Sequence, residues 1–399
     1  MKFKNSKKIL KKGLKFIPEQ TMTFAKRADQ YPLLSPNYIK SAKGCEFIDV
    51  DGNKFIDYTM GLGTSVLGYN DSFVNKKVHD QIDEGTLFSL PSVLEVKMAE
   101  ELNKLIPSAQ SIRFYKNGAD ICSLAVRLAR SYTKKKHVLF SGYHGHHEWY
   151  SFTLRDSGNI QEMKNYSHKI PFNSFSEIKS KVEELKNDVS IIILEIDFFR
   201  PKKGYLNKLK KYCTKNNIVL AFDEMWTGFR FPGFSFQKYI KVTPNISLFS
   251  KGISNGYTLA AIVGDKKILN EFNNIWGYTT FGSDALSLKA GLSTIQRIKK
   301  VSAIDHIWKL GNYMIDKLKV LLRKNNLQNQ IKIIGYPCRF KLHFIENKNE
   351  TKIIYKIKET LIKNNILWNN MFVISYSHKK YHIKKTLKAF DESFNKLNQ

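Results

Sequence analysis

An acidic residue and a lysine, each at the end of an apolar segment, are the residues whose types and spacing point most directly to chemistry. Asp223 closes the run IVLAFDE, and Lys251 closes SLFSK just before a glycine. They lie 28 residues apart, about the length of one strand–helix–strand unit, so we expect both at one edge of a sheet. A carboxylate for a protonated ring nitrogen and an amine for a Schiff base are what a pyridoxal phosphate enzyme needs. The alternatives are an ion pair between Asp223 and Arg230, and a surface role for Lys251.

Two further strand ends carry residues that could hold a ligand. Asn117-Gly118-Ala119 stands directly before a helix, where exposed backbone N–H groups and the helix dipole favour an anion such as phosphate. The next strand end gives Tyr143-His144, followed by two more histidines at 146 and 147. Three histidines suggest a metal, but the HExxH spacing is absent. We therefore expect no metal, and we expect Tyr143 and His144 to cover a flat ligand.

The segments around these residues alternate between apolar strands and helices. SIIILEI (190–196) is a continuous apolar run, as expected for a strand covered on both faces. Such alternation predicts an α/β domain with a mostly parallel or mixed sheet. CEFIDVDGNKFIDY (45–58) reads as a strand hairpin around an Asp-Gly-Asn turn. We expect a large domain over 51–295 and a smaller α+β domain built from 1–50 and 296–399.

Composition narrows the class of protein. The chain has 399 residues and a formal charge of +30, but only 10 of its 65 basic residues are arginine. Arginine dominates specific nucleic-acid recognition, so we expect no nucleic-acid partner. The four cysteines form no CxxC pair, which favours a reduced, cytoplasmic setting. No apolar run reaches the roughly 18 residues of a membrane span.

Six stretches in order carry a resemblance to a known family. The chain resembles the class III (ω-type) aminotransferases of the fold-type I pyridoxal phosphate enzymes, in the branch that contains glutamate-1-semialdehyde aminomutase. The similarity covers roughly residues 35–295. The matching stretches are AKGCEFIDVDGNKFIDY, KNGADICSLAVRLARSYT, YHGHH, DEMWTGFR, SLFSKGISNGYTLAAIVG and TTFGSDALSLKAG. The resemblance implies a large domain with a mostly parallel seven-stranded sheet, a small domain from the chain ends, and a homodimer with shared active sites.

The resemblance also implies roles for the residues at the ring of pyridoxal 5'-phosphate. Lys251 would bond the cofactor and shuttle a proton between the substrate carbon and the cofactor. Asp223 would bind the pyridine nitrogen. Met225 and Tyr143 would cover the two ring faces, and Glu195 matches a family Glu-Pro strand end that has Ile196 in place of the proline.

Other matched residues would hold the phosphate and the substrate. Asn117, Gly118 and Ala119 replace the common Ser-Gly-Thr, so the phosphate would rely on backbone N–H groups. Thr280 matches the threonine that reaches the phosphate of the partner subunit. Arg27 lies about where the branch has a substrate-facing arginine, and Trp226 would narrow the pocket beside Asp223.

Three functions remain open from the sequence. The first is an aminotransferase that passes an amino group from a donor such as glutamate to a carbonyl acceptor, such as a sugar or a small metabolite for surface polysaccharide. The second is an isomerase like glutamate-1-semialdehyde 2,1-aminomutase. Ser283-Asp284-Ala285 stands where that branch tends to have Gly-Asn-Pro, which counts against it. The third is a non-catalytic basic binding protein, which the presence of both Lys251 and Asp223 opposes.

Overall fold

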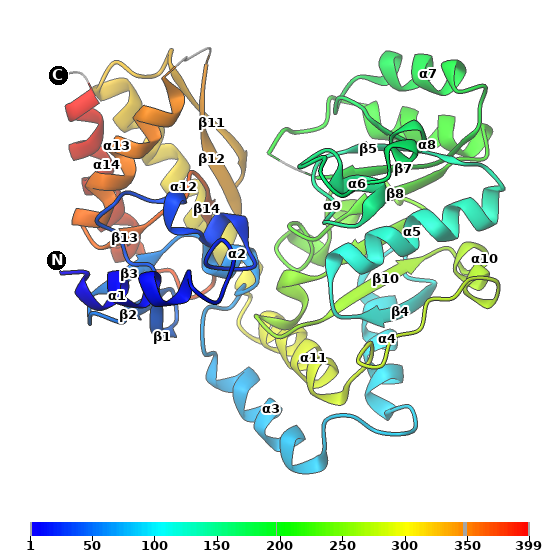
Figure 1. The fold of residues 1–399 in the computed structure, drawn as a ribbon, viewed down its shortest axis with the longest axis horizontal. Helices are drawn as coiled ribbons and strands as arrows, with labels where there is room; N and C mark the ends of the chain where they lie inside the picture. The colour runs from blue at the N-terminus through cyan, green and yellow to red at the C-terminus, as the bar shows by residue number, and fades with distance from the viewer. Residues whose placement is uncertain (1, 197, 346–348, 398–399) are drawn as a thin grey trace. The chain divides into compact units, whose positions relative to one another are not determined.

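The chain folds into two compact units, which are described separately. The computed structural model describes residues 2–196, 198–345 and 349–397. One unit, here the sheet unit, is Phe73–Arg297. The other, here the terminal unit, combines Met1–Ser72 with Ile298–Gln399. Figure 1 colours the chain from its N-terminus to its C-terminus. No helix within the described ranges has the length and apolar character needed to cross a membrane.

The sheet unit is built on a seven-stranded sheet in the order β4-β10-β9-β8-β7-β5-β6. Only β10 runs against its neighbours, so the sheet is mostly parallel, as predicted. Its strands are β4 Ser111–Tyr115, β5 His137–Ser141, β6 Ser167–Lys169, β7 Val189–Glu195, β8 Val219–Asp223, β9 Ile246–Phe249 and β10 Ala260–Gly264. Its helices are α3 Ser72–Glu84, α4 Val93–Leu105, α5 Gly118–Thr133, α6 Glu148–Ser151, α7 Phe175–Glu184, α8 Tyr205–Lys215, α9 Phe236–Ile240, α10 Lys266–Leu269 and α11 Ala285–Lys300.

Helix α5 positions much of the site because it packs across the middle of this sheet. It contacts β7, β8, β9 and β10. Its buried side chains include Ile121, Leu124, Ala125 and Leu128, a spacing that gives one apolar stripe on a helix. All seven residues of β7 are buried, which explains its unbroken apolar sequence. Each fully buried aliphatic side chain contributes on the order of 1.5–3 kcal/mol, so the sheet and α5 form a rigid base.

The terminal unit contains two smaller sheets, ordered β1-β2-β3-β13 and β11-β12-β14. Its strands are β1 Ile39–Lys43, β2 Glu46–Asp49, β3 Lys54–Asp57, β11 Ile331–Tyr336, β12 Arg339–Phe344, β13 Ile366–Leu367 and β14 Phe372–Val373. Its helices are α1 Lys4–Gly13, α2 Met60–Gly63, α12 Ala303–Lys324, α13 Glu350–Lys363 and α14 Lys380–Leu397, with α14 packed on α12 and α13.

The predicted hairpin is present and decides where residues 51–72 belong. β2 pairs antiparallel with β3, and the rings of Phe47 and Phe55 stack at 5.2 Å. β3 also pairs in parallel with β13, with Ile56 opposite Ile366. The structure therefore groups residues 51–72 with the chain ends, whereas the sequence placed them with the large domain. Strand pairing over some 310 residues of chain leaves no local signal.

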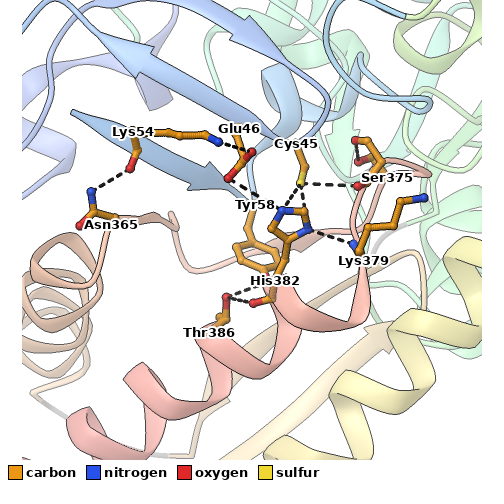
Figure 2. Close-up of polar contacts among 10 residues, drawn as sticks. Cys45, Glu46, Lys54, Tyr58, Asn365, Ser375, Lys379, His382 and Thr386 are labelled. Carbon is orange, nitrogen blue, oxygen red and sulfur yellow. Dashed lines mark hydrogen bonds and ion pairs between the residues drawn. The ribbon is translucent and has the colours of Figure 1, made fainter. Parts of the chain in front are cut away.

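A buried polar cluster joins β2 to the start of α14 in the terminal unit (Figure 2). Nδ1 of His382 accepts the backbone N–H of Lys379 at 3.0 Å. The Cys45 sulfur lies 3.4 and 3.6 Å from the two nitrogens of that ring, so it sits over the ring face. Burial raises the pKa of the Cys45 thiol to about 12. The geometry and the protonated thiol identify this as a packing contact and not a nucleophile–base pair.

Candidate active site

The carboxyl ends of four neighbouring strands surround one cavity in the sheet unit. Glu195 ends β7 and lies directly opposite Asp223, which ends β8. Lys251 follows β9, and Tyr143 follows β5 after a tight turn. The cavity has a volume of about 240 Å³ and is lined by Asn117, Gly118, Ala119, Cys122, Tyr143, His144, Gly145, His146, Glu195, Asp223, Met225, Trp226, Ser250 and Lys251. The carboxyl ends of parallel strands meet at the same edge of the sheet, so residues from separate sequence motifs come together here, as we expected for Asp223 and Lys251.

Asp223 is buried at the base of this cavity and is held from three sides. Nδ1 of His144 lies 2.9 Å from its Oδ2, and the Met225 N–H donates to its Oδ1 at 3.1 Å. Nε2 of His144 lies 3.1 Å from the backbone carbonyl oxygen of Ser141. An oxygen atom therefore lies within hydrogen-bond distance of each nitrogen of the His144 ring. These contacts fix the orientation of the Asp223 side chain.

Cys122 is the third neighbour of Asp223. Its sulfur lies 3.7 Å from Oδ2. Burial, and then the Asp223 charge, raise the pKa of this thiol well above its usual value. The group therefore remains a thiol that can donate a weak hydrogen bond to the carboxylate. Ligand atoms of Cys122, His144 and Asp223 all lie within 4.8 Å of one another, which would also suit a metal ion. The expectation of no metal stays a prediction.

Lys251 occupies a strained turn between β9 and the short helix that follows. Its φ angle is +50°, in the left-handed region that costs a non-glycine residue free energy. Gly252 is required next, because a Cβ there would lie 2.7 Å from Nη1 of Arg230. Arg230 thus packs beneath the lysine turn. The Lys251 ammonium lies 3.9 Å from the centre of the Trp226 ring.

The start of α5 offers a seat for a phosphate. Asn117 caps the helix in an extended conformation, and its side-chain amide donates to Asp120 at 3.1 Å. A Cβ on Gly118 would lie 2.9 Å from the Met225 sulfur, so only glycine leaves room there. Asn117, Gly118 and Ala119 stand at the start of this 16-residue helix and line the cavity, where the first N–H groups of a helix favour an anion. These residues fit the phosphate of pyridoxal 5'-phosphate.

Tyr143 and Met225 line the cavity as the predicted ring-covering residues. The Tyr143 N–H donates to Oε2 of Glu195 at 2.8 Å. Gly142 allows the loop to come this close to Glu195. Its φ is +104°, and a Cβ at this position would lie 2.3 Å from Cβ of Glu195. Glu195 thus has a structural role at the site: it anchors the loop that carries Tyr143.

Two predicted residues are not among those that line the cavity. Thr280 is exposed on the loop before α11 and does not line it. Arg27 belongs to the terminal unit, where it pairs with Glu19 at 2.9 Å and Asp29 at 2.6 Å. The Asp29 hydrogen bond raises the pKa of this guanidinium. The proposed partner-subunit and substrate roles of Thr280 and Arg27 stay predictions.

Sequence reasoning missed Cys122, Gly145, His146 and Ser250 as lining residues. Cys122 lies four residues after Gly118 on the same helix, so it shares that helix face, a signal that was available. Gly145 is revealed only by the fold, because a Cβ there would lie 2.5 Å from Cβ of Ala119. Glu224, beside Asp223, points away and accepts hydrogen bonds from Thr227, Phe236 and Gln237.

Comparisons with known proteins place this geometry in a family. The family model "Aminotransferase class-III" matches residues 27–392. The glutamate-1-semialdehyde 2,1-aminomutase of Methanosphaera stadtmanae is 29% identical over the whole of both chains. Among solved structures, the FumI protein of Sphingopyxis sp. MTA144, in its PLP form, has a TM-score of 0.92 at 20% identity, covering 99% of this chain and 96% of its own. A glutamate-1-semialdehyde aminomutase from Pseudomonas aeruginosa has a TM-score of 0.88 at 15% identity, covering 99% and 95%. The chain belongs to the class-III aminotransferase family, which confirms the fold-type I architecture and pyridoxal 5'-phosphate as the cofactor.

Proposed function

We propose that the protein is an aminomutase that moves an amino group between neighbouring carbons of one small substrate, in the manner of glutamate-1-semialdehyde 2,1-aminomutase. The observation that carries this proposal is the similarity to enzymes of that name along the full chain. It reverses the order of the two readings from sequence, in which the aminotransferase came first. The residues at the cavity supply the chemistry that both reactions share.

The lysine and the aspartate perform the central steps. Pyridoxal phosphate, when bound, supplies an aldehyde that condenses with amines and a ring that takes up an electron pair. The Lys251 amine would bond that aldehyde and would carry a proton to and from the substrate carbon. The Asp223 carboxylate accepts the N–H of the protonated ring nitrogen, and His144 and the Met225 N–H keep the carboxylate in place. Tyr143 and Met225 would confine the ring from either side, and the N-terminus of α5 would bind the phosphate.

We also propose a homodimer in which Thr280 reaches the partner's phosphate. Large apolar side chains are exposed around its loop: Trp276, Tyr278 and Phe281 are 76%, 61% and 59% exposed. The guanidinium of Arg113 lies over the ring of Tyr278 at 4.9 Å, which stiffens the loop. An apolar surface of this kind marks a protein interface. Sedimentation of the purified protein tests this, and a monomer with full cofactor occupancy would contradict it.

The decisive experiment supplies glutamate-1-semialdehyde to the cofactor-loaded protein with no second amino donor. We expect 5-aminolevulinate to form, and to be lost in Lys251→Ala, with Lys211→Ala on the exposed face of α8 as the matched control. A protein that holds the cofactor and makes no 5-aminolevulinate refutes the aminomutase.

One observation favours the aminotransferase as a second candidate. Asp284 forms an ion pair with Lys116 and accepts the Ser287 N–H at 2.9 Å. Lys116 also donates to the Ser287 hydroxyl at 2.8 Å. This fixes the loop that the sequence identifies as altered from the aminomutase pattern. An aminotransferase predicts that glutamate alone removes the visible absorption of the loaded protein and yields 2-oxoglutarate in stoichiometric amount.

A further inference from the structure

Trp226 makes a contact with Lys251 that the reaction scheme above does not use. The lysine Nζ lies 3.9 Å from the centre of the indole ring. The negative face of an indole attracts an ammonium group and has no comparable attraction for a neutral amine. Both side chains line the same cavity, where the attraction is stronger than in open water.

We propose that Trp226 is a positioning residue that stabilises the ammonium form of the Lys251 amino group at the stages in which that amine, released from the cofactor, has taken up the proton of the substrate carbon. The proposal rests on the proposed function only in taking Lys251 as the amine that bonds the cofactor. Held in this way, the ammonium keeps its proton within the cavity, and the lysine does not rebond while the substrate amino group is on the cofactor. The proton is then at Nζ when a substrate carbon needs it.

Other charged and titratable groups face Lys251 from the elements around the cavity. The carboxylates of Asp223 and Glu195 lie at the ends of β8 and β7, and the Cys122 thiol lies on α5. His144, His146 and Tyr143 come from the loop after β5. All of them remain when Trp226 alone is changed, so a comparison of variants at this position isolates the contribution of the indole.

The test measures how fast Lys251 reacts with cyanate in cofactor-free protein. Cyanate modifies only the neutral amine, and peptide mass spectrometry reports each lysine separately. The rate is measured from pH 7 to pH 10 for wild type, Trp226→Phe and Trp226→Leu. We expect Trp226→Leu to move the pH midpoint of Lys251 modification down by about one unit, which makes the reaction about tenfold faster below the midpoint. Trp226→Phe, which keeps an aromatic face, should fall between the two.

Two controls keep the result interpretable. Lys211, exposed on α8, is the internal reference and should react alike in every variant. Tyr132→Leu changes an exposed aromatic side chain near the C-terminal end of α5, in the same unit, and should leave the Lys251 midpoint unchanged. An unshifted midpoint in Trp226→Leu overturns the proposal. So does slower modification at every pH, because that would mean the indole merely keeps the cavity open.

The measurement separates this proposal from the proposed function. Cyanate labelling needs neither cofactor nor substrate, so the midpoint is readable even if no 5-aminolevulinate is ever formed. Uptake of pyridoxal phosphate, followed by visible absorption, reports separately whether Lys251 bonds the cofactor. If the midpoint shifts but the protein never takes up the cofactor, the claim that Lys251 bonds the cofactor is wrong. The claim that Trp226 stabilises the ammonium form of Lys251 would then still hold.

Discussion

His378 should make the stability of the terminal unit fall in mild acid. Its ring is fully buried beside the Tyr58 ring, with centroids 4.9 Å apart. Its Nδ1 accepts the Ser375 N–H at 3.1 Å and lies 2.9 Å from the Ser375 hydroxyl. Burial, reinforced by the neighbouring His382, lowers the pKa of His378 to about 3. The ring is therefore neutral in the folded protein throughout the ordinary pH range.

The size of the effect follows from linkage. An unfolded histidine has a pKa of about 6.5, so below that pH the unfolded chain binds a proton that the folded chain refuses. Stability is thus complete above pH 6.5 and is lost as the pH falls toward the folded value. Between pH 7.5 and pH 5 the loss from this one ring is about 2 kcal/mol, and it is the same for any folded pKa below about 4.

Hydrogen exchange in α14 is the appropriate assay, because α14 follows His378 and packs within the same unit. Protection is compared at pH 7.5 and pH 5 for wild type and His378→Asn, whose amide oxygen can still accept the Ser375 N–H. From pH 7.5 to pH 5, the free energy of opening measured for α14 should fall by about 2 kcal/mol more in wild type than in the variant. His343→Asn, at a partly exposed position on β12, is the matched control and should behave like wild type. Equal losses in wild type and His378→Asn, or a His378 ring that titrates near pH 6.5 by NMR, would refute the reasoning.

Three further predictions concern single side chains. Asp223→Asn should still bind pyridoxal phosphate but lower turnover by about 100-fold or more, because the amide no longer stabilises a protonated ring nitrogen; steady-state kinetics check this, and unchanged turnover would contradict the role of the carboxylate. Gly311→Ala, normally favourable in a helix, should destabilise the terminal unit by about 1–3 kcal/mol in urea unfolding, since its Cβ would lie 1.9 Å from the Pro337 carbonyl oxygen. Glu224→Gln should cost about 1–3 kcal/mol in the sheet unit by the same measurement, because the amide nitrogen would face either the N–H of Phe236 at Oε2 or the N–H donors of Gln237 at Oε1; a neutral result would mean that the side chain can rotate away.

The strand ends were predictable from sequence because each combines an apolar run with an abrupt polar residue. Asp223 and Lys251 stand out on that ground alone, and the fold places both at one cavity. The three-residue strand β6 gave no signal, since Ser-His-Lys has no apolar run and pairs only at the sheet edge. Its short length, its polar residues and its edge position together left no pattern from which the strand could be predicted.

Contacts that depend on the close approach of two backbone segments also could not be predicted from the sequence. Gly142 and Gly145 look like ordinary turn glycines in sequence, yet each leaves space for a particular neighbour across the site. Lys251 and Trp226 lie in two different turns, and their contact exists only because the fold brings these turns together. Neither turn's sequence predicts the contact. The ion pairs of Arg27 with Glu19 and Asp29 were likewise not predicted from the sequence, and its substrate contact stays a prediction.

The parallel pairing of β3 with β13 has a consequence for synthesis on the ribosome. β3 emerges early, but its partner lies roughly 310 residues later, which at about 5–20 residues per second is a delay of about 15–60 s. The sheet unit is continuous in the chain and can fold during that interval. At that stage the stacked Phe47 and Phe55 have three of the four strands of their sheet, and part of their apolar surface stays uncovered until β13 is made. The nascent chain is thus a candidate for chaperone binding at its first 60 residues, and slowing translation should lengthen that exposure.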